Sequence, residues 1–88
     1  MSKYIFPAIF TEEKNGYSVN FPDIDGCFTC GETLVEAMEM ASDALSLMLA
    51  DYEETGTAIP TATKINQLVT NNNEFAELIT GETDKYKR

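Results

Sequence analysis

The clearest alternation of hydrophobic and polar positions runs from Tyr17 to Phe21. Tyr17, Val19 and Phe21 are apolar, and the two residues between them are polar. A period of two is typical of a strand that buries one face and leaves the other in water. Pro22 cannot donate a ladder hydrogen bond, so we expect the strand to stop there.

A turn and a further strand are predicted directly after it. Asp23 and Asp25 can bond to nearby backbone amides, and Gly26 can adopt a positive φ without a Cβ clash. Residues 27–30 are apolar enough to pair back as the next strand, and Gly31 ends it. This stretch therefore reverses the chain and leads it toward a helix start.

An earlier strand is predicted from Lys3 to Thr11, and both of its faces are apolar. One face carries Tyr4, Phe6, Ala8 and Phe10, and the other carries Ile5, Pro7 and Ile9. One face can cover a core while the other meets another surface. Because proline lacks an N–H, Pro7 favours an edge strand or a bulge. Residues 12–16 are predicted to form a hairpin loop with Asn15-Gly16 as the turn, so the first two strands should be antiparallel neighbours.

A long amphipathic helix is predicted from Leu34 to about Thr55. Thr33 and Glu36 form a capping box at its start, and Gly56 suits the cap at its end. Its apolar residues follow the i, i+3, i+4 spacing of one stripe packed against a sheet. The stripe consists of Leu34, Ala37, Met38, Ala41, Leu45, Met48, Leu49 and Tyr52. Three methionines of the helix are predicted to fill the core rather than to line a cofactor site: Met38, Met40 and Met48.

The pattern is weaker after the helix. Residues 57–66 form a polar loop that leads into a possible helical turn. From Glu74 onward two alternatives stay open on periodicity alone. The spacing of Phe75, Leu78 and Ile79 suits a helix, whereas the alternation between Phe75 and Ile79 suits a strand.

The length of 88 residues predicts one small domain. Folding at this size buries roughly 60% of the surface of the unfolded chain, so assembly into a homo-oligomer would add stability. No apolar run is long enough to span a membrane, and the first residues lack the pattern of a signal peptide. We therefore expect a cytoplasmic protein that does not enter a membrane.

The charge is strongly acidic, with 15 Asp and Glu against 6 Lys and Arg. Three of the basic residues lie in the last four positions, as Lys85, Lys87 and Arg88. Residues 1–84 therefore carry three basic and 15 acidic residues, a net charge of −12. Such a surface repels nucleic acid and favours a basic partner, although solubility alone is a simpler explanation of an acidic composition.

The residues available for catalysis are few. The chain has no histidine, which removes the commonest general base and metal ligand. Cys27 and Cys30 form a single C-x-x-C, whereas a zinc site needs further ligands and a redox pair usually sits at a helix N-terminus. We expect two reduced cysteines that point to opposite faces of a strand.

Asp23 and Asp25, with Glu32 or Glu36 nearby, could in principle hold a divalent metal for phosphodiester hydrolysis. Turn chemistry and helix capping explain the same residues without a metal, and no base or phosphate-binding cation accompanies them. We therefore predict no catalytic, metal or cofactor site. The alternatives are a metal-dependent nuclease-like enzyme and an acidic adaptor with another partner.

An ordered set of residues links these elements: Tyr17, Val19, Phe21, Pro22, Asp23, Gly26, Thr29, Gly31, Thr33, Glu36 and Ala37. Their order and spacing resemble the pattern of the HicB-like antitoxin family of type II toxin-antitoxin systems. The likeness extends more weakly through residues 5–10 and 74–88. The resemblance implies that these residues serve the fold or an interaction surface.

The fold that the resemblance implies is a single small α+β domain of β-β-β-α-β order. One helix packs on an antiparallel-rich sheet, similar to a reduced ribonuclease H sheet. The last strand would lie at Glu74 to Thr83, which decides between the two alternatives for this segment. Gly81 and Thr83 are not apolar, so we expect the far end of that strand to fray.

The function that the resemblance implies is that of an antitoxin. Such proteins bind and silence a small basic HicA-type toxin, which cleaves messenger RNA with the help of a histidine. Longer members add a C-terminal DNA-binding module. We expect residues 1–88 to form one HicB-like domain without that module, to be no enzyme, and to bind no specific operator alone.

Overall fold

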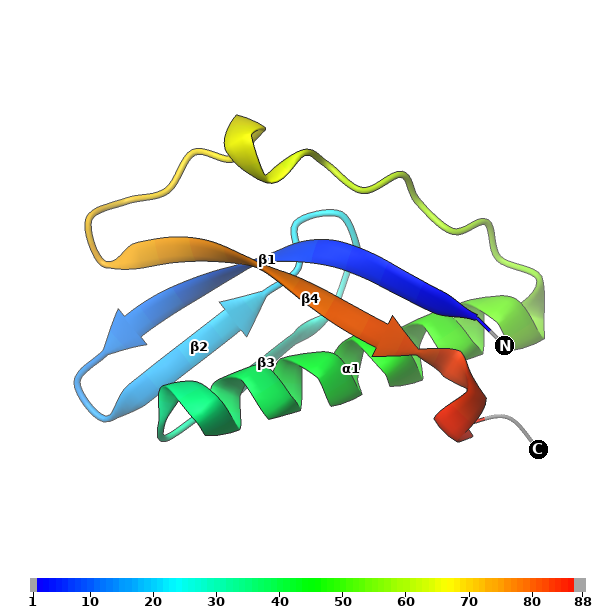
Figure 1. Ribbon diagram of the computed structural model, residues 1–88, viewed down its shortest axis with the longest axis horizontal. Helices are drawn as coiled ribbons and strands as arrows, with labels where there is room; N and C mark the ends of the chain where they lie inside the picture. The colour runs from blue at the N-terminus through cyan, green and yellow to red at the C-terminus, as the bar shows by residue number, and fades with distance from the viewer. Residues whose placement is uncertain (1, 87–88) are drawn as a thin grey trace.

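The computed structural model describes residues 2–86, which form a four-stranded antiparallel sheet with one helix on one of its faces (Figure 1). The elements are β1 (Lys3–Glu13), β2 (Gly16–Asn20), β3 (Phe28–Gly31), α1 (Leu34–Thr55) and β4 (Glu74–Glu82), with short 3₁₀ turns η1 (Ile65–Gln67) and η2 (Thr83–Tyr86). The predicted β-β-β-α-β order and α+β class are confirmed, and so are the bounds of the helix. Of the basic cluster at the chain end, Lys87 and Arg88 lie outside the described residues.

The strands follow the order β3-β2-β1-β4 across the sheet. β4 pairs with β1 over nearly its whole length, from Lys3 opposite Glu82 to Thr11 opposite Glu74. This pairing makes the segment from Glu74 a strand, as the resemblance implies. The long segment between α1 and β4 runs the length of the molecule before the chain re-enters the sheet (Figure 1).

The hairpin and the third strand are each displaced slightly from their predicted positions. β1 continues to Glu13, which pairs with Gly16, so the turn consists of residues 14 and 15 rather than Asn15-Gly16. The third strand begins one residue later than predicted, at Phe28. Cys27 instead closes the preceding loop, because its carbonyl accepts a hydrogen bond from the N–H of Phe21 at 3.0 Å.

β1 is an inner strand of the sheet, so the prediction that Pro7 places this strand at an edge is wrong for β1 as a whole. β2 pairs with β1 only from Ile9 onward, so it does not reach Pro7. Glu12 donates its N–H toward Asn73 on the β4 side, and successive amides of a strand point in opposite directions. The nitrogen of Pro7 therefore points away from β4, toward the side on which β2 does not extend this far. No ladder hydrogen bond is lost there.

The core lies between α1 and the sheet face that carries Phe6, Ala8 and Phe10. Phe10 stacks on Phe75 of β4, with ring centroids 5.3 Å apart. The remaining members of this core cluster are Val19, Phe21, Ile24, Cys27, Ala37, Ala41, Leu45, Leu49 and Ile79. The opposite face of the sheet is partly open, since Ile5 of β1 and Leu78 of β4 are about half exposed.

The far end of β4 does not fray, contrary to expectation. Gly81 is buried, and a Cβ at this position would lie 2.9 Å from Cγ of Leu45. Thr83 is fully buried and donates its N–H to the carbonyl of Ser2 at 3.1 Å. The missing side chain of Gly81 lets α1 approach the strand, which explains why an apolar residue is not needed there.

Candidate functional site

The apolar residues of the family pattern lie in the core. Val19 and Phe21 are fully buried, and Tyr17 is partly buried with its ring edge-on to Phe75 at 6.2 Å. Tyr17 and Val19 alternate along β2 and Phe21 follows directly after it, as the period of two predicts. Val19 and Phe21 are therefore not available to a ligand, whereas Tyr17 also lines a cavity.

Asp23 fastens this loop to a distant part of the chain. Its carboxylate accepts two hydrogen bonds from Thr63, one from the backbone N–H at 2.9 Å and one from the hydroxyl at 2.5 Å. The sequence-based expectation of nearby amide donors is wrong for Asp23, because its partner lies 40 residues away in the segment between α1 and β4. Asp25 is exposed. The two aspartates therefore have different surroundings.

The two glycines of the pattern have different roles: Gly26 allows a turn, and Gly31 allows β3 to approach α1 closely. Gly26 has a φ of 75°, which suits the predicted turn. At Gly31 an added Cβ would lie 2.5 Å from the backbone nitrogen of Ala37. The end of β3 can therefore touch the first turn of α1 only if residue 31 has no side chain.

The predicted capping box is present in a modified form. Thr33 is the N-cap of α1, and its hydroxyl accepts a hydrogen bond from the N–H of Glu36 at 3.1 Å. Glu36 in turn accepts a hydrogen bond from the N–H of Glu32 at 2.9 Å, one residue before the cap. Thr33 and Glu36 of the family pattern thus serve to start the helix.

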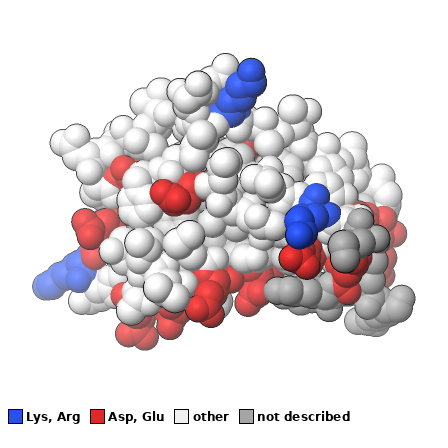
Figure 2. Space-filling view, in the orientation of Figure 1, with Lys and Arg blue, Asp and Glu red and all other residues white. Residues whose placement is uncertain are grey.

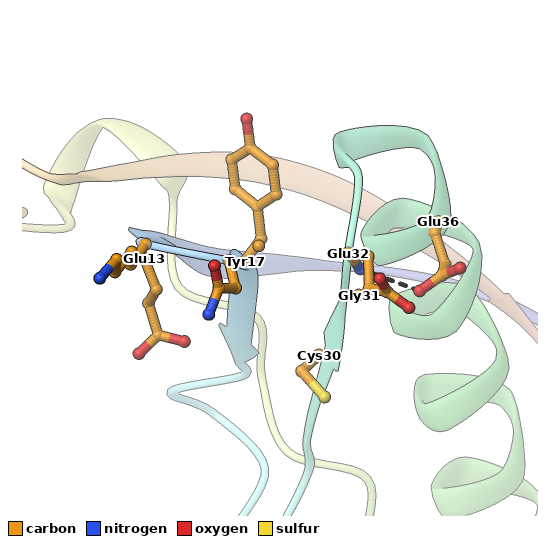
Figure 3. A pocket seen from close by; sticks show the side chains of 9 residues that line it. Glu13, Tyr17, Cys30, Gly31, Glu32 and Glu36 are labelled. Atoms are coloured by element: carbon orange, nitrogen blue, oxygen red, sulfur yellow. Dashed lines mark hydrogen bonds between the residues drawn. The ribbon is translucent and has the colours of Figure 1, made fainter.

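A cavity of about 490 Å³ lies where the β1–β2 turn meets the start of α1 (Figure 3). Glu32 and Glu36 lie on its helix side and Glu13 on its hairpin side, and the exposed Cys30 also lines it. Within residues 2–86 no group of three His, Cys, Asp or Glu side chains is placed to hold a metal ion. Asp23, Asp25 and these glutamates are not brought together as a metal site would require.

The two cysteines differ in their surroundings, and both are free. Burial raises the pKa of the Cys27 thiol to about 11, because a thiolate would lose its hydration there. Cys27 is therefore protonated near neutral pH and poorly nucleophilic. Cys30 is exposed, so the two thiols differ in burial. The prediction that they point to opposite faces of one strand is wrong, because Cys27 precedes β3.

A second cavity, of about 360 Å³, lies between β3 and α1, and we call it the β3–α1 groove. It is lined by Gly26, Cys27, Phe28, Ala44, Leu47, Met48 and Asp51. Phe28 is 71% exposed and Leu47 is 57% exposed. Sequence reasoning missed both residues. Phe28 belongs to a short apolar stretch, whereas Leu47 lies off the apolar stripe of α1, and that position is the signal that could have found it.

The sequence predicted that the three methionines of the helix fill the core, and this is wrong for two of them. Met48 packs partly buried against the core, whereas Met40 is 42% exposed one turn before the β3–α1 groove. Met38 is also partly exposed. The apolar stripe is therefore wider than the part of the helix that the sheet covers.

All charged residues of α1 are acidic. The helix contains six acidic residues and no Lys or Arg: Glu36, Glu39, Asp43, Asp51, Glu53 and Glu54. Figure 2 shows acidic side chains gathered along the side of the molecule on which α1 lies. A basic surface would be attracted to this side.

The sequence of residues 6–84 matches the family described as the HicB-like antitoxin of bacterial toxin-antitoxin systems. The chain therefore belongs to the HicB-like antitoxin family. This is a family of antitoxins and not of enzymes. Within residues 2–86 the helix is too polar to cross a lipid bilayer.

Two curated relatives illustrate the relationship. The chain is 32% identical to an uncharacterised 14.9 kDa protein of Haemophilus phage HP1, over 91% of this chain and 59% of that protein. It is 43% identical to the antitoxin HicB of Escherichia coli strain K12, over 69% of this chain and 45% of that protein. The chain thus spans about half the length of the curated relatives it matches.

Solved structures share the fold. A chain of a toxin-antitoxin complex from Streptococcus pneumoniae superposes with a TM-score of 0.89 at 24% identity, over 97% of this chain and 73% of that one. The N-terminal domain of the antitoxin HicB of Burkholderia pseudomallei gives a TM-score of 0.72 at 24% identity, over 86% of this chain and 95% of that one. A chain of a complex described as HicA3 and HicB3 gives 0.71 at 21% identity, over 86% and 95%.

Proposed function

We propose that this chain is the toxin-binding part of an antitoxin, which neutralises a small basic HicA-type toxin by protein–protein association. The observation that carries the proposal is the family match, which spans residues 6–84 and so covers most of β1 together with β2, β3, α1 and β4. One structural neighbour is itself described as a HicA3 and HicB3 toxin-antitoxin complex, which supports the class of partner.

The electrostatics support a basic partner. The chain carries a net charge of −9, and the acidic side chains gather on the side of α1 (Figure 2). Opposite charges across an interface raise the rate of association and exclude partners of the wrong sign. The same charge repels a phosphate backbone, so we propose that this chain alone binds no specific operator.

Self-association is a further part of the proposal. Ile5 is 54% exposed and Leu78 is 55% exposed on the open face of the sheet, where water penalises apolar surface. We expect light scattering at high micromolar concentration to give a mass above that of one chain. A monomer under those conditions would contradict this expectation.

The test uses the short reading frame beside this gene, which we expect to encode a basic, histidine-containing chain. Inducing that chain alone should arrest growth, and co-expression of residues 1–88 should restore it. The two chains should also co-purify in a stable complex. Growth arrest that residues 1–88 do not relieve, together with failure to co-purify, would refute the proposal.

A further inference from the structure

The outward side of α1 exposes large apolar side chains that the core does not use. Leu47 is two positions from the fully buried Leu45, which is about 200° around a helix. Met40 lies on the same outward side, since it is seven residues from Leu47 and so two turns away. Folding of this domain does not require apolar residues at either position.

These side chains border a cavity and are not scattered singly. Leu47 lines the β3–α1 groove together with Phe28, the first residue of β3. β3 is an outer strand of the sheet, so no further strand of residues 2–86 covers this side of the groove. An exposed apolar groove of this kind is typical of a site that receives a side chain from a partner.

The rim of the groove determines the kind of partner. Asp51 lines the groove itself, and Asp43 lies one turn before Leu47 on the exposed side of α1. Glu54 follows near the C-terminal end of the helix, where the helix dipole already disfavours negative charge and the last turn of α1 contains no basic residue. An apolar pocket with such a rim is complementary to an apolar side chain flanked by Lys or Arg.

A second copy of this chain fits the groove less well. Two copies that met groove to groove would bring two helices together, each with six acidic and no basic residues. Like charges in close contact oppose such an interface. The charge therefore favours a basic partner over self-association at this surface.

We propose that the β3–α1 groove is the docking surface for the basic toxin, which inserts an apolar side chain between Phe28 and Leu47. Lys or Arg side chains of the toxin pair with Asp43, Asp51 and Glu54. This inference rests on the proposed antitoxin function and names the surface that performs it.

The test compares two leucines of nearly equal exposure on different sides of the molecule. Leu47 is 57% exposed at the groove, and Leu78 is 55% exposed on the open face of the sheet. Binding to the product of the neighbouring reading frame, made inactive by replacement of its catalytic histidine, is measured by calorimetry at low salt. We expect Leu47→Asp to weaken binding by at least about tenfold and Leu78→Asp by less than about twofold.

A second pair of variants tests the charges. Asp43→Lys combined with Asp51→Lys should slow association in stopped-flow measurements, and the effect should shrink at high salt. Glu77→Lys, an exposed residue of β4, is the control and should change the association rate much less. Circular dichroism of every variant verifies that the fold is retained.

The outcomes separate this inference from the proposed function. If the wild-type chain does not bind the toxin, the proposed function and this docking surface both fail. If it binds and Leu47→Asp binds equally well, only the docking surface is wrong. Loss of toxin binding in Leu78→Asp alone would assign docking to the open sheet face. Loss of self-association in Leu47→Asp with unchanged toxin binding would assign the groove to a second copy.

Discussion

The inner and outer sides of α1 carry similar apolar residues that have different consequences. On the inner side, Leu45 and Leu49 are fully buried against the sheet. On the outer side, Leu47 and Met40 remain exposed beside a cavity and a row of carboxylates. Burial, rather than residue type, therefore separates side chains that stabilise the fold from those that are available to a partner.

The same contrast holds for the polar residues of the family pattern. Asp23 accepts two hydrogen bonds from Thr63, whereas Asp25 two positions later is exposed. The pattern therefore marks residues that build the fold more than residues that contact a ligand. The predicted docking residues Phe28 and Leu47 are not members of the pattern.

The largest effect on the free energy of unfolding is expected from a core residue of α1. Leu45→Ala removes buried methyl groups and leaves a cavity between α1 and β4, which should lower the free energy of unfolding by about 2–5 kcal/mol. Leu47→Ala should change it by less than about 0.5 kcal/mol, because its side chain is exposed. Urea denaturation measures both, and equal losses would remove the distinction between the two sides.

A smaller loss is expected at the loop. Asp23→Ala leaves the hydroxyl and N–H of Thr63 without their acceptor and should lower the free energy of unfolding by about 1–3 kcal/mol. Asp25→Ala should have an effect below about 0.5 kcal/mol.

Neither variant nor the wild type should cleave RNA with any divalent metal. Metal-dependent cleavage that Asp23→Ala abolishes would support the nuclease alternative.

The N-cap of α1 should contribute less to stability than the hydrogen bonds of Asp23. Thr33→Ala removes the acceptor of the Glu36 N–H and should lower the free energy of unfolding by about 1 kcal/mol. Thr61, an exposed residue of the segment after α1, gives the matched control, and Thr61→Ala should be nearly neutral. Thermal melts that place both variants at the wild-type value would show that the cap is unimportant.

Near neutral pH the smallest effect is expected from ionisation of the Cys27 thiol, and this effect grows as the pH rises. The pKa of Cys27 is about 11 in the folded chain against 9.0 for an unburied thiol, so the unfolded chain loses this proton first. The stability that the thiol contributes should be complete below pH 9 and decline between pH 9 and 11. Cys27→Ala should flatten the decline in pH-dependent melts relative to the wild-type chain, and an unchanged decline would contradict this assignment.

Local patterns in the sequence were sufficient for most of the secondary structure. The alternation from Tyr17 to Phe21 predicted β2, and the spacing and caps of residues 33–56 predicted α1 with its observed bounds. These features depend on residues within one or two turns of each other, so their physical causes are contained in a short stretch of chain.

The tertiary structure decided what depends on residues far apart in the chain. Pairing with β1 made the segment from Glu74 a strand. β2 pairs with β1 only as far as Ile9, so the missing N–H of Pro7 removes no hydrogen bond between these strands. The partner of Asp23 lies 40 residues away, and the exposure of Leu47 depends on which side of α1 the sheet covers. Periodicity defines the faces of an element, but only the packing of the other elements determines which face is buried.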